Sequence, residues 1–254
     1  MTTWVLLRGL MREARHWGEF PLQFQHAMGG QKVITLDFPG NGSLHAQTSA
    51  CSVEEMVSYA RSHLKQLGCA PPYNLLAVSL GGMVAVAWSE LFPAELEKMV
   101  LINTSLARYN PFYHRLRPKN YLALSLLLFG SPTQRENLIL KLTSTRSSTE
   151  NLQAILEQWV TYAKEYPIAR ANILRQLQAA LAYRASPAMP PIPVLLLAGQ
   201  QDQLVNAQCS LKLAQHWGCA IKLHPTAGHD LPLDDGAWVT QQVKEWLPSY
   251  SNSK

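Results

Sequence analysis

The sequence predicts an α/β fold, with a doubly wound, mostly parallel sheet and a helical cap inserted between the fourth and fifth predicted strands. Short apolar runs alternate with longer segments of helical pattern, which is typical of a sheet with crossover helices. The runs are apolar throughout, as expected when helices cover both faces of a sheet. One long helical segment interrupts this alternation, and we interpret it as the cap.

Length and composition allow a substantial core. The chain has 254 residues, of which 47% are hydrophobic and only 15% are charged. Single α/β domains reach this size. The predicted strands are the six apolar runs at residues 4–7, 32–37, 74–78, 99–103, 192–198 and 220–224.

Three helices of the core are predicted from local patterns. Residues 52–67 begin with Ser52 as an N-cap and Glu55 three residues later, which together form a capping box. Residues 82–91 continue the third strand as an apolar helix, and residues 238–247 form an amphipathic helix near the end of the chain.

The segment between the fourth and fifth strands is too long for one crossover helix. Pro118, Pro132 and Pro167 divide it into several helices, because proline interrupts a helix interior. We therefore assign residues 1–105 and 188–254 to the α/β core and residues 106–187 to the cap.

Basic charge is concentrated in this segment. Residues 106–190 contain eleven Lys/Arg and four Asp/Glu, a net charge of +7, so the other residues carry eleven against thirteen, or −2, within the total of +5. No aromatic-and-basic recognition motif accompanies it, and we expect no nucleic-acid partner. The charge is either a solvated surface or a surface that attracts an anionic substrate or an acidic acyl carrier protein.

Nothing in the sequence predicts secretion, membrane insertion or a metal. The first apolar run ends at Arg8, short of a secretory signal. The longest apolar run, residues 121–130, is about half of what a bilayer crossing needs. The four cysteines and the histidines lack metal-ligand spacing. We expect a cytoplasmic protein with no transmembrane segment, no metal and no cofactor.

Ser79 stands where a reactive nucleophile is expected. It follows the third predicted strand and precedes a helix, in the stretch NLLAVSLGGMVAV. A serine at the apex of this turn needs small residues two positions away on either side, so that strand and helix can approach closely. Ala77 and Gly81 meet this requirement, although the usual pattern is G-x-S-x-G.

A carboxylate and a histidine follow the last two predicted strands. Asp202 lies in the loop after the fifth strand and His229 in the loop after the sixth. Because the carboxyl ends of parallel strands meet at one edge, these side chains are expected beside Ser79. A serine nucleophile needs an imidazole base, and the imidazole needs a carboxylate that orients it. The chain order serine, aspartate, histidine is that of the α/β hydrolases.

The sequence resembles the α/β-hydrolase superfamily over both flanks of the chain. The matching stretches are VLLRG, LDFPGNG, AVSLGG, GQQD and AGH. Within this superfamily, the sequence resembles the small capped carboxylesterases of the pimeloyl-carrier methyl ester esterase type. The resemblance implies an α/β-hydrolase fold, with the backbone N–H groups of Leu10 and Leu80 as the oxyanion hole.

The predicted function is a serine hydrolase that cleaves a carboxylic ester or thioester through Ser79, Asp202 and His229. Carbon–carbon bond hydrolysis and acyl transfer use the same residues and remain alternatives. A non-catalytic binding module on the same scaffold is a further alternative, favoured only by Arg8 and Ala77.

Several residues near the predicted site have open roles. Arg8 replaces the histidine that usually precedes the first glycine of the family motif, and it either binds a substrate carboxylate or pairs with a loop acid. His16 either borders the pocket or is structural. Arg115 and Arg117 are candidate substrate-binding residues at the pocket mouth. We expect Asp230, Asp234 and Asp235, which lie near His229, to be solvated.

Overall fold

A computed structural model describes residues 2–145 and 149–251. Six parallel strands form one sheet in the order β2-β1-β3-β4-β5-β6. Their bounds are β1 Thr3–Leu7, β2 Val33–Leu36, β3 Tyr73–Val78, β4 Leu96–Ile102, β5 Val194–Gly199 and β6 Ala220–His224. The predicted α/β fold with a parallel sheet is confirmed, because each apolar run forms a strand.

Helices cover both faces of the sheet. Alternate residues of a strand point to opposite faces. Val5 and Leu7 of β1 therefore belong to the buried cluster on the face covered by α2 (Val53–Gln66), α3 (Leu80–Leu91) and α9 (Gln208–Trp217). Trp4 and Leu6 pack with α1 (Phe20–Ala27) and α10 (Leu231–Ser251) on the other face. Burial on both faces explains why the strand sequences are apolar throughout.

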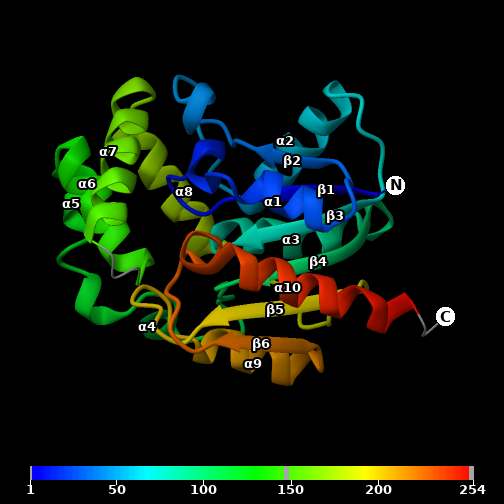
Figure 1. Cartoon of the computed structure of the whole chain (residues 1–254). Helices are drawn as coiled ribbons and strands as arrows, with labels where there is room; N and C mark the ends of the chain where they lie inside the picture. Colours follow the sequence, from blue (N-terminus) through cyan, green and yellow to red (C-terminus); the bar gives the residue numbers. More distant parts are fainter. Residues whose placement is uncertain (1, 146–148, 252–254) are drawn as a thin grey trace.

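The segment between β4 and β5 forms helices beside the edge to which the strand arrows point in Figure 1. The elements are α4 Phe112–Arg115, the 3-10 helix η4 Pro118–Asn120, α5 Ser125–Phe129, α6 Pro132–Thr143, α7 Thr149–Glu165 and α8 Arg170–Ala182. We call them together the cap. Pro118 and Pro132 each occupy the first position of their helix, and Pro167 lies between α7 and α8. The boundaries assigned to core and cap remain predictions.

Local patterns predicted some helices better than others. Helix α2 begins after Ser52, whose side chain accepts a hydrogen bond from Glu55 N at 3.2 Å. The sequence interpretation missed α1 and α9. It also placed the start of α10 seven residues late, because non-helical backbone at Asp235 separates the first residues of this helix from the rest. The described residues also form the 3-10 helices η1 Ala14–Trp17, η2 Gly42–Leu44 and η3 Pro93–Glu95. Within the described residues, no helix is both long and apolar enough to cross a membrane.

Candidate active site

Ser79 occupies a strained turn between β3 and α3. Its φ of 56° and ψ of −115° lie outside the regions that most residues adopt. A Cβ added at Gly81 would lie 2.5 Å from the Leu7 carbonyl oxygen, and one at Gly9 would lie 3.2 Å from the Ser79 Cβ. The helix, the turn and the end of β1 thus approach so closely that only glycine fits at position 81. This is the geometry expected of a nucleophile turn.

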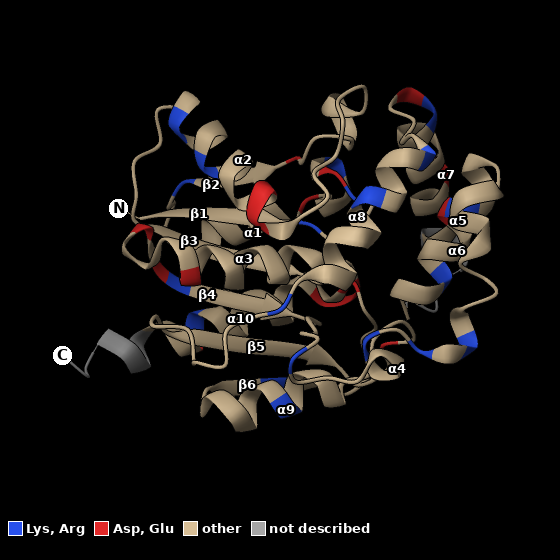
Figure 2. Ribbon diagram, turned by 180° about the vertical axis from the view of Figure 1, so that it is seen from behind, with Lys and Arg blue, Asp and Glu red and all other residues tan. Residues whose placement is uncertain are grey.

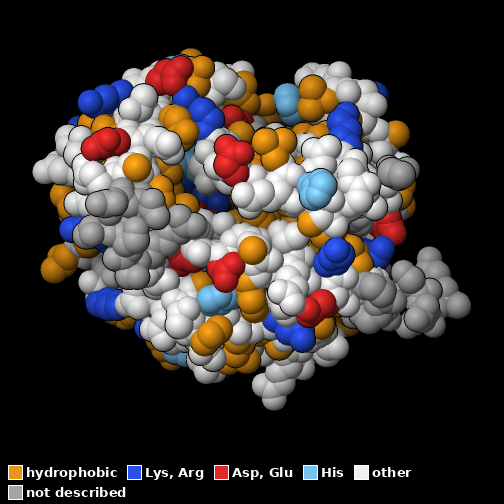
Figure 3. All heavy atoms as spheres, in the orientation of Figure 1, with side chains coloured by type: hydrophobic (Ala, Val, Ile, Leu, Met, Phe, Trp, Pro, Cys, Tyr) orange, Lys and Arg blue, Asp and Glu red, His pale blue; other side chains and the backbone are white. Residues whose placement is uncertain are grey.

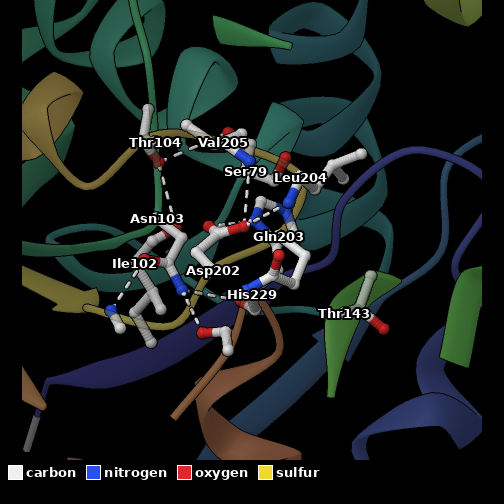
Figure 4. A network of polar contacts seen from close by, with 12 residues as sticks. Ser79, Ile102, Asn103, Thr104, Thr143, Asp202, Gln203, Leu204, Val205 and His229 are labelled. Carbon is white, nitrogen blue, oxygen red and sulfur yellow. Dashed lines mark hydrogen bonds and ion pairs between the residues drawn. The ribbon is translucent and has the colours of Figure 1, made fainter. Parts of the chain in front are cut away.

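Asp202 and His229 form a buried hydrogen-bonded pair. The Nδ1–H group of His229 donates to Asp202 Oδ2 at 2.6 Å, and Asp202 Oδ1 accepts from the backbone N–H groups of Leu204 and Val205, both at 2.8 Å. Figure 4 shows this network. Asp202 has no exposed surface and His229 is 5% exposed. Because both carboxylate oxygens are engaged, Asp202 fixes the ring orientation and leaves His229 Nε2 available to accept a proton.

The charge state of His229 depends on competing effects. Burial opposes protonation of the ring, but the Asp202 carboxylate, through charge and hydrogen bond, outweighs it and raises the pKa of His229. Asp230 acts in the same direction, whereas Arg8 opposes it. Asp202 therefore stabilises the imidazolium that forms when this ring accepts a proton.

The end of β4 connects the loops that carry these residues. Ile102 O accepts a hydrogen bond from Ser79 N at 2.9 Å. Next to it, the Asn103 side chain donates to the carbonyl oxygens of Gly228 and His229 at 3.0 and 2.7 Å and accepts from Gly199 N at 3.0 Å. One buried amide thus links the loop that begins at β5 with the histidine loop. Among described residues, Ser79 Oγ makes no hydrogen bond. The hydrogen bonds of catalytic groups are often long before substrate binds and shorten in the complex.

The sequence interpretation missed the role of Asn103, which it treated as the last residue of a strand. Its backbone φ is +48°, a conformation that asparagine tolerates better than most residues. A polar residue that closes the apolar run MVLIN was the available signal.

The two predicted oxyanion donors flank the serine turn. Leu80 directly follows Ser79, and Leu10 follows Gly9. Within the described parts of the chain, neither backbone N–H has a hydrogen-bond partner. The following residue, Met11, donates its N–H to Gln176 Oε1 of α8 at 2.9 Å. The cap therefore holds this loop in place while the amide of Leu10 stays free.

Arg8 pairs with an acid of the histidine loop. Its guanidinium donates to both oxygens of Asp230, at 3.0 and 2.5 Å, and lies 4.6 Å from the Trp17 ring centroid. Arg8 and Asp230 are each 3% exposed. Of the two roles considered for Arg8, the structure therefore favours pairing with a loop acid over binding a substrate carboxylate.

The expectation that Asp230 is solvated is wrong, because its side chain is buried against Arg8. Its position next to His229 in the sequence did not indicate this contact. Asp234 is half-buried, and its carboxylate accepts hydrogen bonds from Gly228 N at 2.7 Å and Ser144 Oγ at 2.5 Å. Asp234 thus ties the histidine loop to the end of α6. Asp235 keeps 42% of its side chain exposed while it contacts His224.

His16 lies under the cap. Its Nδ1 accepts a hydrogen bond from Glu13 N at 3.1 Å, and its ring packs edge-on against Trp159 and Tyr162 of α7. Burial, followed by the charges of Arg12 and Arg8, holds the pKa of His16 well below its usual value, so the ring is neutral.

The neutral His16 borders a small cavity between core and cap. The cavity measures about 30 Å³ and is also lined by Met11, Asn41, Glu136 and Tyr162. The space-filling view shows the surface hollowed between these two parts of the molecule (Figure 3). Ser79, Asp202 and His229 are not among its lining residues. His16 therefore packs core against cap and borders a water-sized space.

The structure places Arg115 and Arg117 partly inside the cap. Arg115 donates to the carbonyl oxygen of Ala180 on α8 at 2.7 Å, and burial, with the nearby charge of Arg184, lowers its pKa. Both arginines are half-buried. Arg115 therefore braces α4 against α8, and the substrate-binding role of the pair remains a prediction.

These features define the α/β-hydrolase fold. The sheet is all-parallel, Ser79 has a positive φ between β3 and α3, and an acid and a histidine follow β5 and β6. The chain belongs to this family: residues 5–236 match the family described as alpha/beta hydrolase fold.

Individual relatives are distant. The chain is 21% identical to the monoacylglycerol lipase ABHD6 of Homo sapiens over 234 residues, which cover 87% of this chain and 68% of that protein. A malate-bound thermophilic esterase from Thermogutta terrifontis has a TM-score of 0.77 at 20% identity, covering 98% of this chain and 90% of that one. The enol-lactonase from Burkholderia xenovorans LB400 has a TM-score of 0.78 at 18% identity, covering 97% and 91%. These structures share the fold.

Proposed function

We propose that this protein is a serine hydrolase that cleaves carboxylic esters through an acyl-enzyme. The observation that carries the proposal is the buried hydrogen bond from His229 to Asp202 at 2.6 Å, on the same sheet edge as the strained turn of Ser79. A histidine oriented by a carboxylate and placed after a parallel strand is the arrangement that activates a serine hydroxyl.

In the proposed reaction, Ser79 Oγ attacks the ester carbonyl while His229 Nε2 takes the hydroxyl proton. Asp202 holds the imidazolium through its hydrogen bond to Nδ1. The free N–H groups of Leu10 and Leu80 stabilise the oxyanion, each contributing about 3 kcal/mol. His229 then returns the proton to the leaving alcohol oxygen, and water, activated by the same histidine, hydrolyses the acyl-enzyme.

A small acyl ester is the substrate class that fits the relatives. Those described above are named as a monoacylglycerol lipase, an esterase and an enol-lactonase. A thioester follows the same chemistry. The half-buried positions of Arg115 and Arg117 weaken the argument for a carrier-bound substrate, so our proposal assigns no role to an acyl carrier protein.

Labelling with a fluorophosphonate probe tests the nucleophile. We expect the probe to modify Ser79 in the folded protein, and Ser79→Ala to abolish labelling. Ser58→Ala, at an exposed serine on α2, is the matched control and should label like the wild type. Equal labelling of the Ser79→Ala protein would refute the assignment.

A panel of p-nitrophenyl acyl esters tests the reaction class. We expect turnover that is lost in His229→Ala and strongly reduced in Asp202→Asn, with unfolding midpoints showing that both variants fold. Turnover of a vinylogous diketone without any esterase activity would replace the proposal with carbon–carbon bond hydrolysis. Absence of both activities and of probe labelling would favour a binding module.

A further inference from the structure

The outer surface of the cap exposes large apolar side chains. Leu122 is 91% exposed, Phe129 is 72% exposed and Phe112 is 67% exposed. Leu126 of α5 and Leu174 and Leu181 of α8 are exposed as well. Single exposed leucines are ordinary, but a group of this kind on neighbouring elements marks an interaction surface.

Contacts join the elements that carry these side chains. Arg170, at the start of α8, lies with its guanidinium 5.7 Å from the Phe129 ring, which joins α5 to α8. Leu174 and Leu181 follow Arg170 by four and eleven residues, so helical spacing places all three on one stripe of α8. The hydrogen bond from Arg115 to Ala180 then joins α4 to the end of the same helix. We call this surface, formed by α4, α5 and α8, the cap outer face.

The charge of the cap outer face has one sign. Residues 106–135 and 166–189 contain eight Lys/Arg and no Asp or Glu. Arg170 and Arg175 of α8 are exposed, and Figure 2 shows basic but no acidic segments on that helix. Further exposed basic residues of the face are Arg108, Lys119 and Arg184.

We propose that the cap outer face docks on the surface of a lipid bilayer that contains anionic headgroups. Exposed leucine and phenylalanine side chains enter the boundary between headgroups and acyl chains, and Lys and Arg side chains are attracted to anionic lipids. An acidic protein partner accounts for the positive charge. It does not explain why Leu122, which is 91% exposed in the turn between η4 and α5, is apolar. The combination of both features favours a lipid surface.

Docking in this way brings the lipid close to the candidate active site. The inner side of α8 carries Gln176, which is fully buried and accepts the hydrogen bond from Met11 beside the predicted oxyanion donor Leu10. Helix α8 thus has the lipid-facing stripe on one side and the loop of the site on the other. The inference concerns a binding surface and does not require the proposed esterase activity.

Vesicle co-sedimentation of the full chain tests the proposal. We expect binding to vesicles of phosphatidylglycerol and phosphatidylcholine, weak binding to phosphatidylcholine alone, and loss of binding as salt rises, because exposed charges are screened. The apolar variant Leu122→Glu/Phe129→Glu should lose most binding. Each of Arg170→Glu and Arg175→Glu should weaken binding by about fivefold or more, the effect of one basic residue near an anionic surface.

Matched substitutions on the core serve as controls. Leu22→Glu on α1 replaces a leucine that is 66% exposed, and Lys65→Glu on α2 reverses an exposed charge. Both should bind vesicles like the wild type, and all variants should keep the wild-type urea unfolding midpoint, which shows that they are folded.

Two results would overturn the proposal. One is vesicle binding that the four substitutions on the cap outer face leave unchanged. The other is binding to an acidic acyl carrier protein that needs Arg170 and Arg175 but not Leu122 or Phe129, combined with no binding to anionic vesicles.

Discussion

Replacing Asn103 by alanine is expected to loosen both loops of the Asp202–His229 pair. The substitution removes three buried hydrogen bonds, to Gly199 N, Gly228 O and His229 O. Each such bond contributes about 1 kcal/mol, and the buried groups left without partners raise the cost. Alanine at a φ of +48° adds about 1 kcal/mol. We expect a loss of roughly 3–5 kcal/mol in the free energy of unfolding, by summing these contributions.

Urea unfolding and ester hydrolysis measure the two consequences. We expect the urea midpoint to fall, and kcat to fall more than KM changes, because the amide acts through the position of His229. Asn103→Asp keeps the acceptor for Gly199 N but turns a carboxylate toward two carbonyl oxygens, so it should be at least as destabilised at neutral pH and should recover partly at low pH.

Asn74→Ala is the matched control for this experiment. Asn74 is also buried, on β3, but its Oδ1 has no partner among the described residues, so its removal breaks no comparable network. The assigned role is wrong if the free energy of unfolding of Asn103→Ala is within about 1 kcal/mol of the wild-type value and kcat is unchanged. A change of that size is typical of a surface substitution.

Three further predictions concern the surroundings of the site. Arg8→Met leaves Asp230 buried without its partner and should lower the free energy of unfolding in urea by about 3–5 kcal/mol. The double variant Arg8→Met/Asp230→Asn should recover part of this loss. If the losses of the two single variants simply add in the double variant, the pair does not act as proposed. Because the raised pKa keeps His229 protonated to higher pH, and the base must be neutral, kcat/KM should fall as pH decreases through a value above the usual 6.5 for histidine. Asp202→Asn should shift this fall in kcat/KM to lower pH. An unchanged pH dependence would contradict the assignment of Asp202 as the partner of His229. Gly81→Ala places a Cβ 2.5 Å from a backbone carbonyl oxygen of β1 and should lower the melting temperature sharply; a wild-type melting temperature would refute this packing.

The sequence alone determined the framework of this protein. Residues 74–78 and 192–198 are apolar at every or nearly every position, and burial on both faces of a parallel sheet is the physical reason. Parallel strands connected by helices end at one edge, so the loops of Ser79, Asp202 and His229 were predictable from their places after strands. The contact between Asp202 and His229 agrees with that prediction, whereas the catalytic roles remain predictions.

Only the tertiary structure decided how the site is supported. Arg8 and Asp230 are 222 positions apart, and no local pattern indicates which acid meets which base. The role of Asn103 was not predictable from local sequence, because its side chain bonds backbone groups of two loops that are distant in the sequence. Arg115 was predicted at the pocket mouth as a candidate substrate-binding residue, yet its guanidinium donates to the Ala180 carbonyl oxygen of α8. Strand and helix patterns arise from neighbours along the chain, but buried polar partners depend on which loops the packed core brings together.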